Sequence, residues 1–405
     1  MNLYVVGLGY VGLPLAILAS KNGYKVFGFD TDQHKIDKLK SGICELPNVS
    51  SDEINDLQKS SSITFINKLP KAVGSSIYII AVPTPLDSKR NPDVSMLESA
   101  CDYVASSVSE DSLIINESTS YIGTLRNLIK PRIESKSGIK GLKYAVAPER
   151  IDPGNRKWNI KNTPRVVAGL TEESCTCAMQ FYSSLCDEVV QVSSPEVAEA
   201  TKLFENTFRQ VNIALVNELS QIAGAFNFST HETINAASTK PFGFMPFYPS
   251  IGVGGHCIPV DPSFLAFSAL QVGQDAEFIK LANKTNLLMP KVVAERIKFF
   301  LEGSLKSKRI QLAGISYKPN SSDLRESPAL NLITELKSLG AIVSWHDPLV
   351  LTYNDEKSSN LDESIDLGLI VTPHAQIDFS IWQKSKTKVL DLSANSLNYG
   401  WVKFL

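Results

Sequence analysis

The fold of this chain is decided by one early stretch, Leu3-Tyr4-Val5-Val6-Gly7-Leu8-Gly9-Tyr10-Val11-Gly12. Its first four residues form an apolar, β-branched run that predicts a strand, and residues 13–22 read as a helix. The glycines between them allow a tight turn and a close backbone approach, and the helix N-terminus offers free N–H groups to a pyrophosphate. The stretch therefore predicts a dinucleotide site built on Gly7, Gly9, Tyr10, Val11 and Gly12.

An acidic residue supports this interpretation. Asp30 ends a second predicted strand, Lys25–Asp30, eighteen residues beyond Gly12. A carboxylate at this place accepts hydrogen bonds from the adenosine ribose and repels a 2′-phosphate, so we expect NAD and not NADP. Lys35 could reach the adenosine half of the cofactor, although a solvated lysine on a helix explains it equally well.

Short apolar runs and helical stretches divide the chain into three blocks. Residues 1–195 alternate predicted strands with helices, and the block from 303 to 405 repeats that alternation, which is typical of parallel sheets with crossover helices. Between them, residues 196–238 form a long helical pattern, too long to be buried within one small domain. It is followed by a Gly- and Pro-rich stretch, residues 239–262, and a return to helix over 263–302. The later predicted strands are Ile77–Val82, Leu113–Glu117, Tyr144–Pro148, Arg165–Gly169, Lys308–Gly314, Ala341–His346, Leu367–Val371 and Lys388–Leu392.

Composition excludes several classes of protein. The 405 residues are 43% hydrophobic and 20% charged, which is typical of a soluble globular protein of two or three domains. Forty basic and forty-two acidic side chains leave a net charge of −2, so neither nucleic acid nor a membrane surface is an expected partner. No apolar run approaches the roughly 18 residues that span a bilayer, and a cytoplasmic enzyme is expected. Six scattered cysteines are read as reduced thiols, and the histidines lack metal-ligand spacing, so no metal is expected.

A second motif surrounds one cysteine: Gly254-Gly255-His256-Cys257-Ile258-Pro259-Val260-Asp261. A lone cysteine is often a small core residue, but two glycines and a proline are poor material for a regular element and suit the presentation of a thiol. Lys202, Asn206 and Arg209 stand at i, i+4 and i+7 of the long helix and share one face. The stripe could be a solvated polar face. Beside a thiol and a dinucleotide site, it reads as a cradle for an anion or oxyanion.

Taken together, the motifs resemble the UDP-glucose/GDP-mannose dehydrogenase family. The resemblance spans roughly residues 5–350 and implies an α/β fold of two Rossmann-like doubly wound domains, joined by a long central helix and a helical dimerisation domain. The implied boundaries are 1–195 for NAD binding, 196–302 for dimerisation and the thiol loop, and 303–405 for UDP-sugar binding. It adds five motifs to the glycine turn, the helix stripe and the thiol loop: Val82-Pro83-Thr84-Pro85, Glu117-Ser118-Thr119, Pro148-Glu149-Arg150, Tyr317-Lys318-Pro319 and Asp323-Leu324-Arg325-Glu326-Ser327.

The family implies a four-electron oxidation of a primary alcohol to a carboxylate, with two NAD per turnover. Cys257 would be the covalent nucleophile, and Lys202 or a water held by Asp261 the base for the alcohol step. Lys202 and Asn206 would stabilise the alkoxide, and Glu149 or Asp261 would activate the water that cleaves the thioester. Thr119 would order that water or the nicotinamide edge.

The family also implies binding roles. Val82, Pro83 and Thr84 would line the NAD site, and Arg325 would approach the NAD pyrophosphate from the C-terminal domain. Lys318 would bind the UDP diphosphate, Arg209 the sugar or uracil end, and Lys240 would reach across a homodimer or higher oligomer. The remaining substrate contacts are expected from Glu149, Arg150, Lys202, Asn206, Gly254, Phe247 and Tyr248.

The segment Thr239–Phe247 looks like the branch that oxidises UDP-N-acetylhexosamines, most like UDP-N-acetylglucosamine, for surface polysaccharide such as capsule or O-antigen. Ala147 and Ser250-Ile251-Gly252 depart from common family residues, and the second departure lies near the sugar pocket. UDP-N-acetylmannosamine, UDP-N-acetylgalactosamine and UDP-glucose remain alternatives. A 6-phosphogluconate-type enzyme would need neither the thiol loop nor a second α/β domain, and a non-catalytic sensor would not need Cys257, Lys202 and Asp261.

Overall fold

The computed structural model describes residues 2–44, 46, 49–151, 155, 157–393 and 403–404. The chain divides into two compact units. Unit 1 comprises residues 1–205 and 263–274, and unit 2 comprises residues 206–262 and 275–405. Two helices, α7 (Pro195–Phe226) and α9 (Asp261–Gln271), contribute residues to both units.

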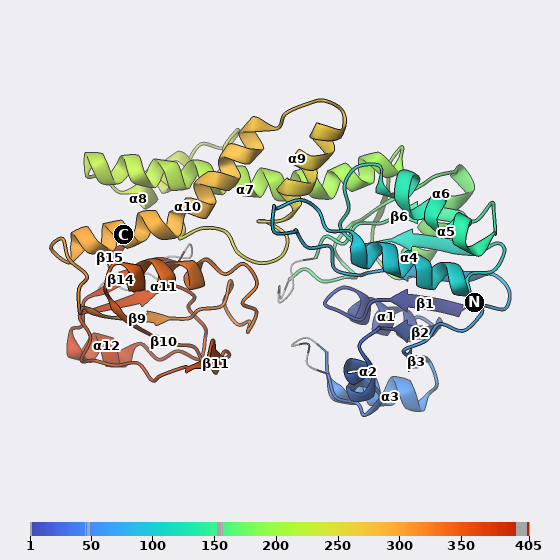
Figure 1. The fold of residues 1–405 in the computed structure, drawn as a ribbon, viewed down its shortest axis with the longest axis horizontal. Coiled ribbons are helices and arrows are strands. Elements are labelled where there is room, and N and C mark those ends of the chain that lie inside the picture. The colour runs from blue at the N-terminus through green and yellow to red at the C-terminus, as the bar shows by residue number, and fades with distance from the viewer. Residues whose placement is uncertain are drawn as a thin grey trace. The chain divides into compact units, whose positions relative to one another are not determined.

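Unit 1 is built on an eight-stranded sheet in the order β3-β2-β1-β4-β5-β6-β7-β8. Figure 1 shows β1, β2 and β3 at one end of this sheet. All neighbouring strands are parallel except β6 and β7. The first six positions have the strand order of a dinucleotide-binding fold, in which β1 and β4 flank the switch point where ligands bind. The strands are β1 (Asn2–Val6), β2 (Lys25–Phe29), β3 (Ile63–Ile66), β4 (Ser76–Ile80), β5 (Leu113–Asn116), β6 (Lys143–Val146), β7 (Arg165–Gly169) and β8 (Val189–Gln191).

Helices cover both faces of this sheet, so its central strands are buried on both sides and read as continuous apolar runs. One apolar core contains residues of α1, α2, α3 and α6, and the other contains residues of α4, η1 and α5. The helices are α1 (Gly12–Lys21), α2 (Gln33–Lys40), α3 (Ser51–Lys59), α4 (Ser95–Ser107), η1 (Leu125–Ile129), α5 (Lys130–Ser137) and α6 (Glu172–Ser183).

Unit 2 holds a five-stranded parallel sheet in the order β10-β9-β13-β14-β15. Counted from β9, this is the 2-1-3-4-5 order of a second doubly wound fold, with its switch point between β9 and β13. Helix α11 packs in one apolar core and α12 in another. The elements are β9 (Arg309–Ala313), α11 (Pro328–Ser338), β10 (Ile342–His346), β11 (Thr352–Tyr353), β12 (Glu356–Lys357), β13 (Leu367–Ile370), α12 (Ser380–Ser385), β14 (Val389–Asp391) and β15 (Lys403–Phe404).

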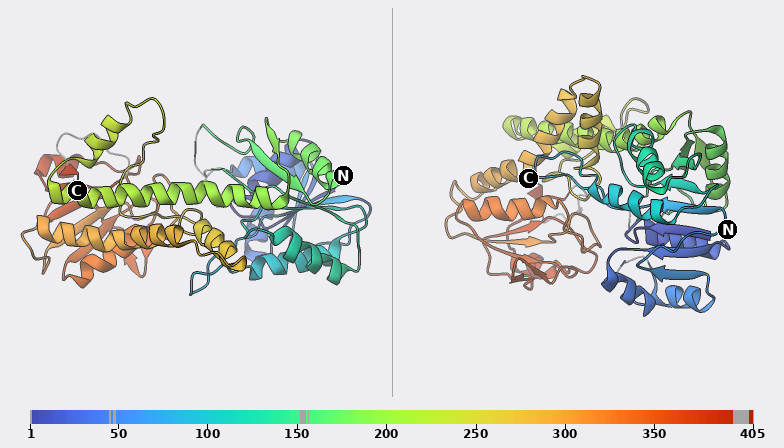
Figure 2. Two further views of the ribbon diagram at one scale, coloured as in Figure 1. Left: turned by 90° about the horizontal axis from the view of Figure 1, so that it is seen from above. Right: turned by 45° about the vertical axis from the view of Figure 1, so that its right-hand side comes forward.

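Unit 2 also contains residues 206–226 of α7, α8 (Thr230–Ala237), the non-helical stretch 238–260 and α10 (Glu277–Phe300). Helix α7 is continuous over its whole length, and α10 runs alongside it (Figure 2). Amide side chains join the two helices: Gln210 donates to Asn283 at 3.1 Å, and Asn217 donates to Asn286 at 3.0 Å. Such buried amide pairs fix the register between two helices, because a shifted register would leave the amides without partners.

The α/β fold with two doubly wound sheets is confirmed. The sequence analysis did not predict β3, β8, β11, β12 or β15, which have two to four residues each, and β8 is largely exposed. The helical pattern of residues 196–238 breaks at Asn227, whose φ of 56° ends α7 before α8 begins. Within the described residues, no helix is long and apolar enough to cross a bilayer, and no group of three His, Cys, Asp or Glu side chains could hold a metal ion.

Candidate active site

The three glycines of the turn after β1 serve two different purposes. Gly7 has a φ of +100°, and a Cβ there would lie 2.5 Å from the carbonyl oxygen of Ala81. A Cβ at Gly12 would lie 1.9 Å from the carbonyl oxygen of Gly7. At Gly9, by contrast, a Cβ would meet no described protein atom within 4 Å. Gly7 and Gly12 are therefore required by the fold, and Gly9 leaves open the space that a bound pyrophosphate needs.

Asp30, which follows β2, is 9% exposed and contacts this turn. Its carboxylate accepts the backbone N–H groups of Leu8 at 3.0 Å and Asp32 at 3.0 Å, and it forms an ion pair with Lys35 at 2.8 Å. The carboxylate thus fixes the glycine turn before any ligand arrives. Lys35 partly neutralises the charge of Asp30. Rejection of a 2′-phosphate would therefore depend more on the volume and the hydrogen bonds of the Asp30 carboxylate than on its negative charge.

Two further predicted segments meet at the carboxyl ends of β4 and β5. The N–H of Val82 donates to the hydroxyl of Ser118 at 2.9 Å, which ties the segment that includes Pro83 and Thr84 to the segment that ends in Thr119. The same first segment supplies the carbonyl of Ala81 that closes on Gly7. These two segments and the glycine turn therefore share one edge of the sheet, where doubly wound folds bind their ligands.

Glu149, which follows β6, belongs to a buried ionic cluster. Glu149 accepts the N–H groups of Arg150 at 2.7 Å and Ile151 at 2.8 Å on one oxygen, and the guanidinium of Arg165 at 2.5 Å on the other. Three of the four lone-pair positions of the Glu149 carboxylate are thus occupied. The Glu149 and Arg165 side chains are 4% and 3% exposed.

Glu117 and Tyr182 complete this cluster. Tyr182 donates its hydroxyl to Glu117, and Arg165 lies 3.5 Å from the other oxygen of the Glu117 carboxylate. Burial raises the pKa of Glu117 to about 7, against the opposing charges of Arg165 and Lys202 and the Tyr182 hydrogen bond. Burial works to lower the pKa of Arg165, but the charges of Glu149 and Glu117 outweigh it, so Arg165 stays charged.

Helix α7 contributes to unit 1 through residues that the sequence analysis did not all single out. Lys202 is 9% exposed. Glu199 accepts the N–H groups of Gly123 at 2.5 Å and Leu125 at 2.9 Å, and burial raises the pKa of Glu199 to about 7. Glu199 thereby anchors the backbone just after Thr119. Arg150, a predicted substrate residue, makes a bidentate ion pair with Glu205, at 2.6 and 3.1 Å. Its guanidinium is thus already paired with a carboxylate of the same chain.

The thiol loop belongs to unit 2. The carbonyl of Cys257 accepts the N–H groups of Val260 at 3.1 Å and Asp261 at 2.8 Å, so the thiol and the Asp261 carboxyl stand one turn apart where α9 begins. Cys257 is half-buried, and Asp261 is 1% exposed. Asn206 donates its amide to Asp261 at 2.6 Å. Unit 2 therefore brings together three of the predicted catalytic residues.

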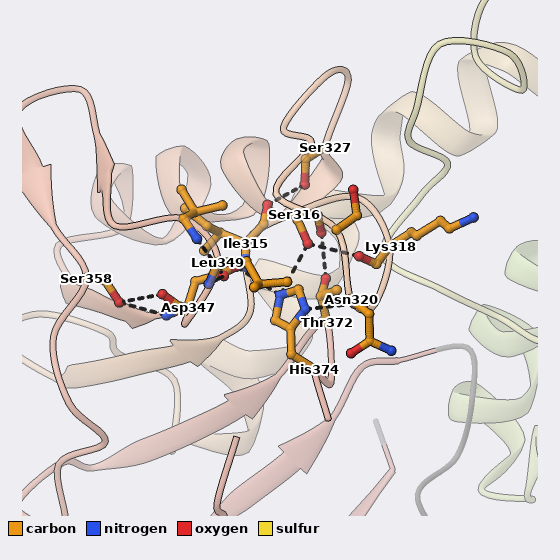
Figure 3. A network of polar contacts seen from close by, with 12 residues as sticks. Ile315, Ser316, Lys318, Asn320, Ser327, Asp347, Leu349, Ser358, Thr372 and His374 are labelled. Atoms are coloured by element: carbon orange, nitrogen blue, oxygen red, sulfur yellow. Dashed lines mark hydrogen bonds and ion pairs between the residues drawn. The ribbon is translucent and has the colours of Figure 1, made fainter. Parts of the chain in front are cut away.

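Two more predicted residues lie in the loops after β9. The Lys318 side chain extends away from the hydrogen-bonded part of its loop (Figure 3). Arg325 pairs with Asp323, with its Nε 2.9 Å from each carboxylate oxygen. Burial works to raise the pKa of Asp323, but the hydrogen bonds from Arg325 outweigh it and lower the pKa.

The remaining predicted substrate residues are more exposed, and three of them contact side chains that the sequence analysis did not predict to bind substrate. Arg209 is exposed, and Lys240 lies over the ring of Phe242 at 4.9 Å. Phe247 packs edge-on against Phe208, and Tyr248 donates to Asn235 at 2.8 Å. The sequence analysis did not assign roles to Glu117, Arg165, Tyr182 or Glu199. Glu117 lies in a quoted motif, whereas the other three carry no local signal.

A phosphate-binding turn in one doubly wound unit, and a half-buried thiol beside a carboxyl–amide pair in the other, define a dinucleotide-dependent dehydrogenase with a candidate nucleophile. Comparison with known proteins narrows this class. The chain matches the NAD-binding domain of the UDP-glucose/GDP-mannose dehydrogenase family over residues 1–186, the central domain over 196–287 and the UDP-binding domain over 311–395. It therefore belongs to the UDP-glucose/GDP-mannose dehydrogenase family, and is an NAD-dependent nucleotide-sugar dehydrogenase.

Named relatives cover nearly the whole chain. Protein CapL of Staphylococcus aureus is 35% identical over 387 residues, which are 92% of this chain and 90% of that protein. The UDP-N-acetyl-D-glucosamine 6-dehydrogenase of Pseudomonas aeruginosa is 34% identical over 86% of this chain and 83% of its own length. The solved structure of a UDP-D-ManNAc dehydrogenase from Pyrococcus horikoshii superposes with a TM-score of 0.88, at 29% identity, and covers 100% of this chain and 99% of that chain.

Proposed function

We propose that this protein oxidises the C6 hydroxymethyl group of a UDP-N-acetylhexosamine to the carboxylate in two NAD-dependent steps, and that UDP-N-acetylglucosamine is its preferred substrate. The observation that carries the proposal is the turn from Cys257 to Asp261, with its 2.8 Å backbone hydrogen bond and its contact to Asn206. This turn places a candidate nucleophile beside a carboxyl and an amide. Oxidation that stopped at the aldehyde would need no nucleophile there.

The residues divide the chemistry as follows. A base, either Lys202 or a water held by Asp261, takes the proton of the C6 hydroxyl. Bound NAD accepts the hydride in each of the two oxidations. The thiolate of Cys257 adds to the aldehyde carbon, and the alkoxide of the resulting thiohemiacetal is stabilised by Lys202 and Asn206. Asn206 has two amide N–H donors, one of which goes to Asp261.

Loss of the second hydride leaves a thioester on Cys257. Water adds to this thioester, the carbon–sulfur bond breaks, and the uronate and the free thiol are released. Glu149 and Asp261 are the candidates for activating that water. The described contacts of Glu149 occupy three lone-pair positions of its carboxylate and leave one for that water, whereas Asp261 is one turn from the thiol.

The substrate assignment is tested by NADH formation with a panel of UDP-N-acetylglucosamine, UDP-N-acetylmannosamine, UDP-N-acetylgalactosamine and UDP-glucose. Of the three relatives named above, one is a UDP-N-acetylglucosamine enzyme and one a UDP-N-acetylmannosamine enzyme, so the panel must separate these epimers. We expect the highest kcat/KM with UDP-N-acetylglucosamine and two NADH per sugar. One NADH per sugar would exclude the four-electron reaction, and a non-catalytic sensor would form none.

Active-site variants separate the proposed roles. Cys257→Ser should stall turnover, and Glu149→Gln should let the thioester accumulate on Cys257, where intact-protein mass spectrometry detects it. Accumulation in Asp261→Asn instead would assign the water to Asp261. A Cys257→Ser variant that still forms two NADH per sugar at the wild-type rate would refute the covalent route.

We further propose a homodimer that forms through α7. The residues Phe204, Phe208, Leu215, Ile222 and Phe226 recur at spacings of four and seven along this helix, which places them near one face. They are exposed, and Phe226 keeps 78% of its surface accessible. Large exposed apolar stripes of this kind are typical of protein interfaces. Light scattering should give twice the 44.4 kDa of the chain, and Leu215→Glu should lower that mass.

A further inference from the structure

A buried histidine–aspartate pair lies at the switch point of the C-terminal sheet. His374 follows β13, and its Nε2 is 3.1 Å from the Oδ2 atom of Asp347, which follows β10 (Figure 3). Both side chains are 0% exposed. Strand β9 lies between β10 and β13, so loops from three adjacent parallel strands meet at this pair. Their carboxyl ends form the edge where such folds bind ligands.

The hydrogen bonds fix the proton position on His374. The backbone N–H of Asn320 donates to Nδ1 at 2.9 Å, and a backbone amide is always a donor. Nδ1 is therefore unprotonated, and the ring proton is on Nε2, facing Asp347. Asp347 also accepts the N–H groups of Ile315 at 2.9 Å, Leu349 at 2.9 Å and Val350 at 3.0 Å. Burial works to raise the pKa of Asp347, but these donors and His374 outweigh it and lower the pKa.

Ser316 gives the cluster the composition of a catalytic triad without its geometry. The hydroxyl of Ser316 lies 3.3 Å from Nε2 of His374, which is the same nitrogen that faces Asp347. In a triad the histidine binds the acid through one nitrogen and the serine through the other. Here the other nitrogen is taken by Asn320, and Ser316 is 1% exposed. The cluster is therefore structural and not a second hydrolytic site.

What the cluster holds is the loop after β9. Ser316 donates to the carbonyl of Lys318 at 3.0 Å, and Thr372 donates to the carbonyl of Ser316 at 2.6 Å. Gly314 has a φ of +80°, and a Cβ there would lie 2.0 Å from the carbonyl oxygen of Thr372. The backbone around Lys318 is thus fixed on several sides, while the Lys318 side chain points away from the cluster (Figure 3).

The same loop supports the thiol loop. A Cβ at Gly254 would lie 2.7 Å from the Cβ of Tyr317, and a Cβ at Gly255 would lie 2.8 Å from the Cε2 atom of the Tyr317 ring. The N–H of Gly255 also donates to the carbonyl of Arg325 at 3.0 Å. The two glycines are therefore required by the approach of Tyr317. A displacement of the Tyr317–Lys318 segment would be passed on to the loop that carries Cys257.

We propose that His374 and Asp347 are positioning residues that hold the loop 314–320 as one support for two functional elements. One element is the ammonium group of Lys318, which recognises a nucleoside diphosphate, and the other is the thiol loop. The identity of the ligand as UDP rests on the proposed function, whereas the mechanical link rests on the contacts alone. Loss of the histidine should therefore change ligand binding and thiol accessibility together.

Three substitutions of His374 separate its two hydrogen bonds. Asn carries an acceptor near the position of Nδ1, so His374→Asn keeps the bond from Asn320. Gln carries a donor near the position of Nε2, so His374→Gln keeps the bond to Asp347, and His374→Ala keeps neither. His346→Ala is the matched control, because the described side-chain hydrogen bond of His346 joins the carbonyl of Ser359 at 2.7 Å and not the loop 314–320.

Two readouts are needed: the Kd of UDP by calorimetry, and the rate at which iodoacetamide alkylates Cys257, by peptide mass spectrometry. The half-buried Cys44 and Cys177 in unit 1 are internal references for alkylation. His374→Ala should weaken UDP binding about tenfold, the effect of one lost buried hydrogen bond. It should also speed alkylation of Cys257 severalfold relative to the references. His374→Asn keeps the bond from Asn320 in the loop, so this variant and the control should stay within about threefold of wild type in both readouts. His374→Gln loses that bond and should shift both readouts in the direction of His374→Ala.

The two readouts test the two parts of the proposal separately: the support of Lys318 and the link to the thiol loop. An unchanged Kd and an unchanged alkylation rate in His374→Ala would overturn the proposal, and a changed Kd alone would overturn the link to the thiol loop. If His374→Ala does not fold, Ser316→Ala removes the hydroxyl that bridges His374 and Lys318, and the same two shifts are expected. If no UDP-sugar yields NADH, the proposed function is refuted, but the positioning role of His374 and Asp347 is not. A wild-type protein that does not bind UDP would overturn the diphosphate half of this proposal.

Discussion

Replacement of Arg165 by leucine should strongly destabilise the N-terminal unit. Arg165 is the only cation within ion-pairing distance of both Glu117 and Glu149 among the described residues, at 3.5 and 2.5 Å. Its loss leaves two carboxyl groups buried at 0% and 4% exposure without an opposite charge in contact. Removal of one partner of a buried ion pair costs about 3–5 kcal/mol. We expect the free energy of unfolding to fall by about that amount at pH 8.

The pH dependence gives a second measure of the same change. The folded pKa of Glu117 is raised to about 7 from an ordinary 4.5, so the folded protein binds more protons than the unfolded chain between these values. Stability from this group is present below pH 4.5 and is lost as the pH rises towards 7. Because the charge of Arg165 lowers the pKa of Glu117, removal of Arg165 should raise this pKa further. The deficit of Arg165→Leu should therefore be smaller at pH 5 than at pH 8.

Urea unfolding at pH 5 and pH 8, followed by circular dichroism, measures both effects. Arg150→Leu is a matched control, because Arg150 makes a bidentate pair with Glu205 of similar length, but the two side chains are 25% and 40% exposed. An exposed pair contributes about 1 kcal/mol or less. If Arg165→Leu costs no more than this control at pH 8, burial does not govern the cluster and the reasoning is refuted.

Two other predictions concern the turns that position ligands. Gly9→Ala should leave the Tm within about 1 °C, because its Cβ meets no described protein atom within 4 Å. The same variant should raise the KM for NAD about tenfold or more, because the methyl group occupies the space of the pyrophosphate. Gly12→Ala, whose Cβ would lie 1.9 Å from the carbonyl oxygen of Gly7, should lower the Tm by several degrees. Equal effects of the two on Tm would contradict this assignment. Asn206→Ala should lower kcat about 10²-fold by removing both an alkoxide donor and the 2.6 Å bond to Asp261, with little change in the KM for NAD; a change in KM alone, measured by NADH absorbance, would exclude it.

Much of this protein is determined by local sequence. The β-branched run before Gly7, the glycine spacing and Asp30 specify a dinucleotide fold, because strand, turn and helix N-terminus are set by neighbouring residues. The glycines around Cys257 likewise mark a loop that no regular element would tolerate. The short strands β3 and β8 escaped prediction, because they are stabilised by their place beside longer strands and not by their own pattern.

Tertiary structure alone decided which charged and polar residues act together. Arg165 and Glu149 are sixteen residues apart, and Glu117 and Tyr182 sixty-five, and only the sheet brings them into one buried cluster. His374 and Asp347 are far apart in sequence, and they meet only because β13 and β10, which precede them, lie on either side of β9 in one parallel sheet. Burial then gives these pairs their strength, because a charge or polar group removed from water is stable only when a partner replaces that water. The spacing of residues in the sequence does not show which buried groups will become partners. The residues that form the thiol loop and the phosphate-binding turn are neighbours in sequence, so those two sites can be predicted from it.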